Sequence, residues 1–234
     1  MINLKMGMPV ELTPEEMEAN FKLLMDRVGA MFESRSEAIY AMYKDFELEV
    51  LSAPASSVEY YHNAFPGGYL DHILRVLEYS FKVYELWKGL GMGVDDFTLE
   101  ELAFVAIHHD LGKLGFPHEN GGRYIWNNSE WHRKNQGKIY DTNPDIPFMK
   151  VQDMSLYMLQ KYGIPLSFNE TMAIKLHDGL YDDVNKAYYI TRQHKSGLRT
   201  NLVNIIHQAD LLASKFEYER WAKLSGQSLK KVKV

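Results

Sequence analysis

The sequence predicts an all-α protein, a helical bundle with one short β-hairpin or irregular insertion at about residues 117–147. Apolar residues recur at helical spacing in long segments on both sides of the insertion. Several of these segments begin with residues that cap helix N-termini. A chain of 234 residues can bury a single core, so we expect one main domain with extensions.

Residues 1–50 are expected to form an N-terminal helical pair packed on the main domain. Thr13 is a good N-cap, Pro14 suits the first helical position, and the two glutamates that follow complement the helix dipole. A second helix is expected from Ser36. The pair carries no set of ligand residues, so the functional alternative to simple packing is binding of a partner or a second copy of the chain.

Residues 51–222 are expected to form the main domain. A long amphipathic helix is predicted from Tyr69 to about Leu90, with Leu86 facing the core. Capping boxes that begin at Thr98 and Ser167 predict two further helices. The last predicted helix begins near Leu198. Its apolar residues are Leu202, Ile205, Ile206, Ala209, Leu212, Phe216 and Trp221.

The insertion at about residues 117–147 loses the helical period. Two short runs, Arg123–Trp126 and Lys138–Tyr140, flank polar residues, which is typical of a β-hairpin or an irregular flap. Its aromatic and basic residues include His118, Arg123, Trp126, Trp131, His132, Arg133 and Tyr140. Such residues suit a substrate lid, and a self-packed excursion is the alternative. Helix is predicted again from Ile146 to Gly163.

The composition excludes several classes of protein. A net charge of −5 gives no global attraction for polyanions, and the absence of cysteine excludes disulfides, thiolate zinc sites and cysteine nucleophiles. No apolar run approaches the ~18 residues of a membrane span, and no leader is recognisable at residues 1–10. We therefore expect a cytoplasmic protein without a membrane partner. Residues 223–234 form a basic tail, expected to be disordered, with nucleic-acid contact as the alternative.

The adjacent residues His109 and Asp110 stand where a predicted helix gives way to Gly112. A neutral imidazole and an ionised carboxylate are both good ligands for divalent metals. Adjacent side chains can meet on one cation only where the backbone leaves the regular helix, so we expect a break at this point. Further ligands must come from elsewhere in the chain. The candidates are His72, His177 and Asp210.

Four motifs follow one another along the chain. They are YHNAFPGGYLDH ending at His72, HDLGK beginning at His109, IKLHDG containing His177, and QADLLASKFE containing Asp210. Their order resembles that of the HD superfamily of metal-dependent phosphohydrolases. The first and third motifs are similar to those of the HD domains of bacterial 3′-to-5′ exoribonucleases. The similarity covers about residues 60–221 and implies an HD-type helical bundle.

The resemblance implies roles for particular residues. The implied metal ligands are His72, His109, Asp110 and Asp210. Asp110 would also orient or deprotonate a water, and Lys113 would contact a phosphate oxygen where negative charge develops. His62 and His177 would contact the substrate phosphate; the alternatives are an ordinary surface loop residue for His62 and metal ligation for His177.

The implied cofactor is a divalent cation, and the mixed His/Asp set fits Mn, Co, Ni, Fe, Zn or Mg. Members of the superfamily that bind two metals place another His in or before the helix that here reads MKVQDMSLYML, which contains no His. One cation is therefore expected rather than two.

Three functions follow from these observations. The first is a metal-dependent phosphohydrolase that hydrolyses a phosphate ester or anhydride of a nucleotide, favoured by the compact size and negative charge. The second is a 3′-to-5′ exonuclease or phosphodiesterase acting on RNA or single-stranded DNA, favoured by the motif subgroup, the aromatic insertion and the basic tail. The third is a catalytically inactive HD-fold binding protein. The expected partner is a phosphate-bearing substrate. The sequence leaves open whether the chain forms a homo-oligomer.

Overall fold

The computed structural model describes residues 11–116, 121–191 and 197–226. This part of the chain contains ten α-helices and one two-stranded antiparallel sheet, which confirms the predicted all-α fold with a short β-hairpin. Within the same residues, no helix combines the length and the apolar character needed to cross a membrane. Residues 1–10, His118 and the basic tail from residue 227 onward lie outside the described residues.

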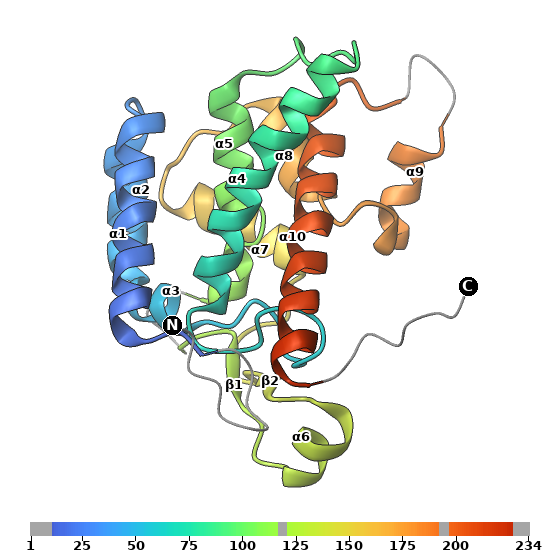
Figure 1. Cartoon of the computed structure of the whole chain (residues 1–234). Coiled ribbons are helices and arrows are strands. Elements are labelled where there is room, and N and C mark those ends of the chain that lie inside the picture. Colours follow the sequence, from blue (N-terminus) through green and yellow to red (C-terminus); the bar gives the residue numbers. More distant parts are fainter. Residues whose placement is uncertain (1–10, 117–120, 192–196, 227–234) are drawn as a thin grey trace, which may run out of the picture.

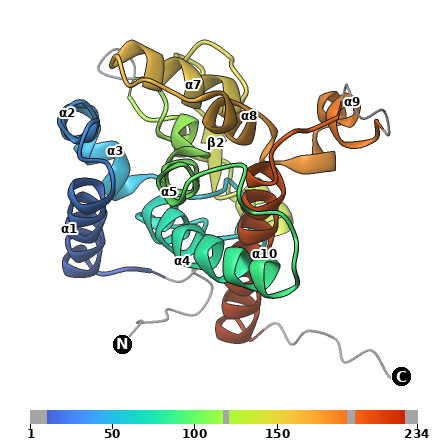
Figure 2. The same ribbon diagram turned by 90° about the horizontal axis from the view of Figure 1, so that it is seen from above.

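Two long helices, α4 (Gly68–Gly89) and α10 (Leu202–Leu224), pack side by side at the centre of the bundle (Figure 1). Helix α5 (Leu99–His108) packs against α4, and α7 (Val151–Lys161) and α8 (Phe168–Leu176) lie on its other side (Figure 2). These helices share one core of fully buried apolar side chains. It includes Leu70, Ile73, Phe104, Met158, Ile174 and Ile206.

Three N-terminal helices, α1 (Pro14–Met31), α2 (Ser36–Asp45) and α3 (Glu47–Ser52), cover one flank of the bundle (Figure 1). Thr13 caps α1 as predicted: its hydroxyl accepts from the Glu16 N–H at 3.2 Å, and the Glu16 carboxylate accepts from the Thr13 N–H at 2.8 Å. The flank contributes fully buried side chains to the same core. They include Leu24, Phe32, Met42 and Phe46.

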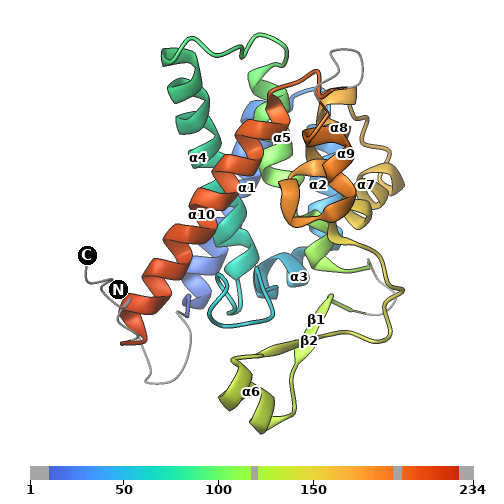
Figure 3. The ribbon, with the colours of Figure 1, turned by 90° about the vertical axis from the view of Figure 1, so that its right-hand side faces the viewer.

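The insertion forms a hairpin that lies below the bundle in Figure 3. Strand β1 (Tyr124–Trp126) pairs antiparallel with β2 (Tyr140–Thr142). Between them lies α6 (Glu130–Gln136), a short helix that the sequence did not predict. The Ser129 hydroxyl caps its N-terminus, and Gly137, with φ of 58°, ends it in the left-handed conformation.

Short elements connect the main helices. They are the 3₁₀ turns η1 (Leu111–Leu114), η2 (Gly179–Tyr181) and η3 (Asp183–Asn185), and the short helix α9 (Lys186–Tyr189).

Two predicted helix starts were too early. Helix α7 begins at Val151 rather than Ile146: Pro147 disfavours helical backbone at Ile146, and the N-cap Lys150 has ψ of 151°. Helix α10 begins at Leu202 rather than near Leu198. Three side chains predicted to face the core are exposed because they lie on the outer faces of α4 and α10. They are Leu86, Leu212 and Phe216.

Candidate metal centre

His72 projects from α4 with its ring fully buried. The helix begins one residue earlier than predicted, so His72 lies at the start of the second turn rather than in the first. Its Nε2 atom lies 3.2 Å from Asp210 Oδ1 on α10 and 3.7 Å from Asp110 Oδ2. This nitrogen is buried and has no hydrogen-bond partner among the described residues; because Nδ1 faces the Glu217 carboxylate, the lone pair of the neutral ring lies at Nε2.

His109 and Asp110 lie where α5 ends, as the sequence predicted. His109 is the C-cap of α5, and Asp110 has φ of −104° and ψ of 14° before the chain enters η1. This break brings His109 Nε2 to 3.4 Å from Asp110 Oδ2. Two adjacent side chains therefore meet at one point.

Helix α7 holds this turn in place. The Ser155 hydroxyl accepts from the Gly112 N–H at 2.8 Å and donates to the His109 carbonyl at 3.1 Å. A Cβ atom at position 112 would lie 2.3 Å from the Val151 carbonyl oxygen. Glycine is therefore required for α7 to approach the turn so closely.

His177 is the C-cap of α8 and is buried. Its Nδ1 lies 2.8 Å from the Ile174 carbonyl oxygen, and the Nδ1 of His109 lies 3.0 Å from that of Ala106. Because a carbonyl only accepts, both rings donate at Nδ1, so the lone pair of each neutral ring lies at Nε2. The Nε2 of His177 lies 3.6 Å from Asp110 Oδ1. Asp110 thus has one oxygen towards His109 and the other towards His177.

The cluster has the donors that a cation needs. In the groups His72–His109–Asp210 and His109–Asp110–His177, one ligand atom from each residue lies within 4.8 Å of the others. The Nε2 atoms of His72 and His109 are buried without a hydrogen-bond partner among the described residues. Buried polar atoms without a partner are costly, and a cation would satisfy them. These buried His and Asp residues could therefore hold a metal ion.

A second layer of charged residues, behind the cluster, holds the ring of His72 in place. These residues were not predicted from the sequence. Glu217 on α10 is buried, with its two oxygens 3.0 and 3.2 Å from His72 Nδ1. Arg75 donates to Glu217 at 2.6 Å and to both oxygens of Asp71 at 2.8 and 3.0 Å. Arg220 donates to Asp71 at 3.0 Å. The available signal was the seven-residue spacing from Asp210 to Glu217, which places both on one face of α10.

The charges of the cluster perturb its pKa values. Burial lowers the pKa of His72, but the carboxylates of Glu217 and Asp210 outweigh burial and raise it to about 10. Burial favours protonation of Asp110, but Lys113 and His109 outweigh burial and hold the pKa of that carboxyl well below its usual range. The pKa of Asp210 is lowered in the same way by His72. The carboxylates therefore stay ionised, as metal ligation requires.

The other predicted residues also lie at the cluster. Lys113 Nζ lies 2.6 Å from Asp110 Oδ2. The ring of His62 is centred 4.9 Å from that of His72, and its buried Nε2 has no hydrogen-bond partner in the described part of the chain. Burial and the charge of Lys113 lower the pKa of His62 to about 4. The structure thus brings together every site residue predicted from the sequence.

Helix α7, which contains no His, places a polar residue near the cluster. Gln152 on α7 is buried, and its carboxamide donates to the carboxylate of Asp178. Asp178 Oδ1 lies 3.5 Å from His177 Nε2. His177, Asp178 and Asp210 form a further group with ligand atoms within 4.8 Å of one another.

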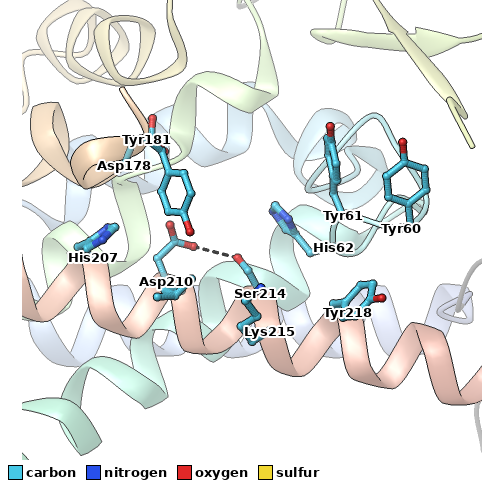
Figure 4. Close-up of a pocket in the computed structure, with 11 residues that line it drawn as sticks. Tyr60, Tyr61, His62, Asp178, Tyr181, His207, Asp210, Ser214, Lys215 and Tyr218 are labelled. Atoms are coloured by element: carbon cyan, nitrogen blue, oxygen red, sulfur yellow. Dashed lines mark hydrogen bonds between the residues drawn. The ribbon is translucent and has the colours of Figure 1, made fainter. Parts of the chain in front are cut away.

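A hollow of about 610 Å³ opens beside the cluster (Figure 4). His62, Asp178 and Asp210 line it on the side of the cluster, and the Tyr181 hydroxyl points towards Asp210. A second hollow of about 430 Å³ shares Asp178 and Tyr181 with the first. Its other lining residues include Arg123, Phe148 and Lys150.

Comparison with known proteins gave no relative from which a function could be transferred. No protein-family model, no curated protein and no solved structure matches the chain.

Proposed function

We propose that the protein is a metal-dependent phosphohydrolase that hydrolyses a phosphate ester or anhydride of a nucleotide. The observation that carries the proposal is the meeting of three buried imidazoles with Asp110 and Asp210 beside an open hollow. His72, His109, Asp110 and Asp210 would hold one cation. The HD-type motifs that supply these residues support the same assignment.

A bound divalent cation would polarise a phosphoryl oxygen and lower the pKa of a water molecule towards ~7. The residues of the chain would do the rest. Asp110 has an oxygen on each side of the cluster, so it can orient a water or accept its proton. Lys113 has three N–H donors, so it can keep its contact with Asp110 and also contact a phosphate oxygen. His177 and His62 would hold the same phosphate.

The donor set limits the identity of the cation. Imidazole nitrogens together with carboxylate oxygens favour a transition metal over calcium, so Mn, Co, Ni, Fe and Zn are the leading candidates, with Mg also compatible. Elemental analysis of the purified protein would identify the metal.

A second candidate function is cleavage of the phosphodiester bond at the end of RNA or single-stranded DNA. The hollow of about 430 Å³ favours this function. Its lining includes Arg123, Lys150 and the 88% exposed ring of Phe148, which could contact a second nucleotide. Lys150 is ion-paired with Asp182 at 2.7 Å and Arg123 donates to the Met149 carbonyl, so both cations are already engaged. We therefore rank this function second.

The test is hydrolysis, with added Mn²⁺, of a panel of nucleotides, cyclic nucleotides, labelled oligonucleotides and p-nitrophenyl phosphate. Turnover should be abolished in His109→Ala and Asp110→Ala, and the best substrate would decide between the two functions. Bound metal without turnover on any member would contradict both and favour an inactive binding protein.

A further inference from the structure

Four residues on one face of α10 line the hollow, and their chemistry changes with distance from the His/Asp cluster. Asp210, Ser214, Lys215 and Tyr218 all line the hollow of about 610 Å³ (Figure 4). They occupy successive turns of one helix, and Asp210 and Tyr218 are separated by about 12 Å along its axis. The Ser214 hydroxyl lies 3.4 Å from Asp210 Oδ1. A ligand on this face would meet the cluster first, then a cation, then an aromatic ring.

Lys215 is the cation on this face, and it is exposed. Some exposed lysines pair with a carboxylate on their own helix, as Lys82 does with Glu78 at 2.5 Å, whereas others, such as Lys44 and Lys223, form no ion pair within the described residues. Among the described residues Lys215 has no ion pair, although Glu219 follows four residues later. An unpaired ammonium group beside the hollow is available to an anion.

Aromatic rings border the end of the hollow that is remote from His207 (Figure 4). Tyr60 and Tyr61 are 43% and 56% exposed, and their rings meet edge to face at 5.3 Å. Tyr218 packs against Trp221, with ring centroids 5.9 Å apart. Trp221 also lies near Tyr60, with ring centroids 6.5 Å apart, but Tyr60 and Tyr61 both stay open to solvent. Open tyrosine rings bind nucleobases by stacking.

We propose that this hollow binds a nucleotide with a second phosphate that is not hydrolysed, with Lys215 contacting that phosphate and the tyrosines stacking on the base. The inference rests on the proposed function, because it places the scissile phosphate at the cluster. The second phosphate has two sources, a nucleoside 5′-polyphosphate or the next link of a nucleic acid strand. In a nucleoside 5′-polyphosphate the additional phosphate lies between the scissile bond and the base, whereas in a strand cleaved at its 3′ end it lies on the other side of the ribose that carries the base.

The test compares AMP, ADP and the 5′-phosphorylated dinucleotide pApA with wild type, Lys215→Met and Tyr218→Leu. Lys223→Met, a matched change at an exposed position of α10 outside the hollow, is the control. Loss of a charged hydrogen bond should lower the ratio of kcat/KM for ADP or pApA to that for AMP by about tenfold in Lys215→Met. Loss of stacking in Tyr218→Leu should lower kcat/KM for all three by about tenfold.

The outcomes distinguish failure of the proposed subsite from failure of the proposed hydrolysis. A fall for ADP alone identifies a polyphosphate, and a fall for pApA alone identifies a strand. Equal ratios in Lys215→Met and Lys223→Met would overturn the subsite. Turnover of p-nitrophenyl phosphate without turnover of any nucleotide would keep the reaction and overturn the subsite. If no ester is hydrolysed, ADP binding by calorimetry decides: binding that Lys215→Met weakens supports the subsite, and no binding by wild type overturns it.

Discussion

Glu217→Gln tests whether the second layer controls the metal centre. Glu217 Oε1 accepts from Arg75 at 2.6 Å, and Oε2 lies 3.0 Å from His72 Nδ1. A glutamine of the same size has only one accepting oxygen. If that oxygen takes the place of Oε1, it keeps Arg75 and only the 3.2 Å contact with His72 Nδ1, while the amide nitrogen replaces the accepting Oε2 and faces the N–H of His72. The reverse orientation loses Arg75. The contact with His72 or the contact with Arg75 is therefore weakened without a change in side-chain volume.

The magnitude follows from the burial of this contact. Loss of the group that orients a metal-binding imidazole typically costs about 10- to 100-fold in metal affinity, or roughly 1.4 to 2.7 kcal/mol. We expect the upper half of this range, because Glu217 is only 1% exposed and no water can take the place of the lost acceptor. Arg75 keeps both contacts with Asp71, so the helix pair should stay folded.

The assay is competition between the protein and a fluorescent chelator for Mn²⁺ or Zn²⁺. Glu219→Gln is the matched control, because it makes the same chemical change two residues later at an exposed position of the same helix. Circular dichroism would show that both variants are folded. A folded Glu217→Gln protein that binds metal as tightly as Glu219→Gln would refute the role of Glu217.

Three further predictions concern stability. Gly112→Ala places Cβ 2.3 Å from the Val151 carbonyl, so it should cost more than ~2 kcal/mol in urea unfolding and weaken metal binding. Gly89→Ala meets nothing within 4 Å and should not destabilise, so equal effects of the two changes would contradict the close approach of α7. Burial lowers the pKa of His108 to about 3, so the unfolded chain takes up a proton below pH ~6.5 that the folded protein excludes. The contribution of His108 to stability is therefore complete above that pH and should fall by ~2 kcal/mol at pH ~5. Urea unfolding at both pH values should show a smaller difference for His108→Phe, and an unchanged difference would contradict this assignment. Removal of the cation with a chelator should lower the Tm, because a ligand at ~1,000 times its Kd stabilises by ~4 kcal/mol, and excess Mn²⁺ should restore it. A Tm that changes with neither treatment would argue against a bound cation.

The sequence was sufficient where local chemistry determines structure. Local signals predicted the starts of three helices: the N-cap Thr13 with Pro14 for α1, and capping boxes at Thr98 and Ser167 for α5 and α8. The residues that satisfy a helix N-terminus lie within a few positions of it. The break at His109 and Asp110 was also predictable, because two adjacent side chains cannot meet within a regular helix. The candidate site residues followed from their motifs.

The sequence was insufficient where structure depends on contacts between distant segments. The pairing of Arg75 with Glu217 joins residues 142 positions apart, and charged residues at helical spacing usually indicate a solvated face. The buried face of α10 contains Ala209, Ala213 and Glu217 rather than the larger Leu212 and Phe216. A prediction based on the large apolar residues assigned Leu212 and Phe216 to the buried face and did not identify Ala213 and Glu217. Helix α6 has no buried residue, so periodicity could not reveal it.

The candidate site has a rigid part within the core and an exposed part at the hollow. Mutations in the two parts should therefore have different effects. His72 and Asp210 lie on α4 and α10, whose packing forms the centre of the core, so cation binding depends on the stability of the bundle. Tyr61 and Tyr181 lie on a loop and on the turn η2, are 56% and 80% exposed, and contribute little to the core. If the proposed function holds, changes on the exposed side should alter the choice of substrate without disturbing the buried His and Asp residues that could hold a metal ion. Lys215 belongs to both parts, because α10 carries it on the same rigid helix as Asp210 and fixes its distance from the metal centre.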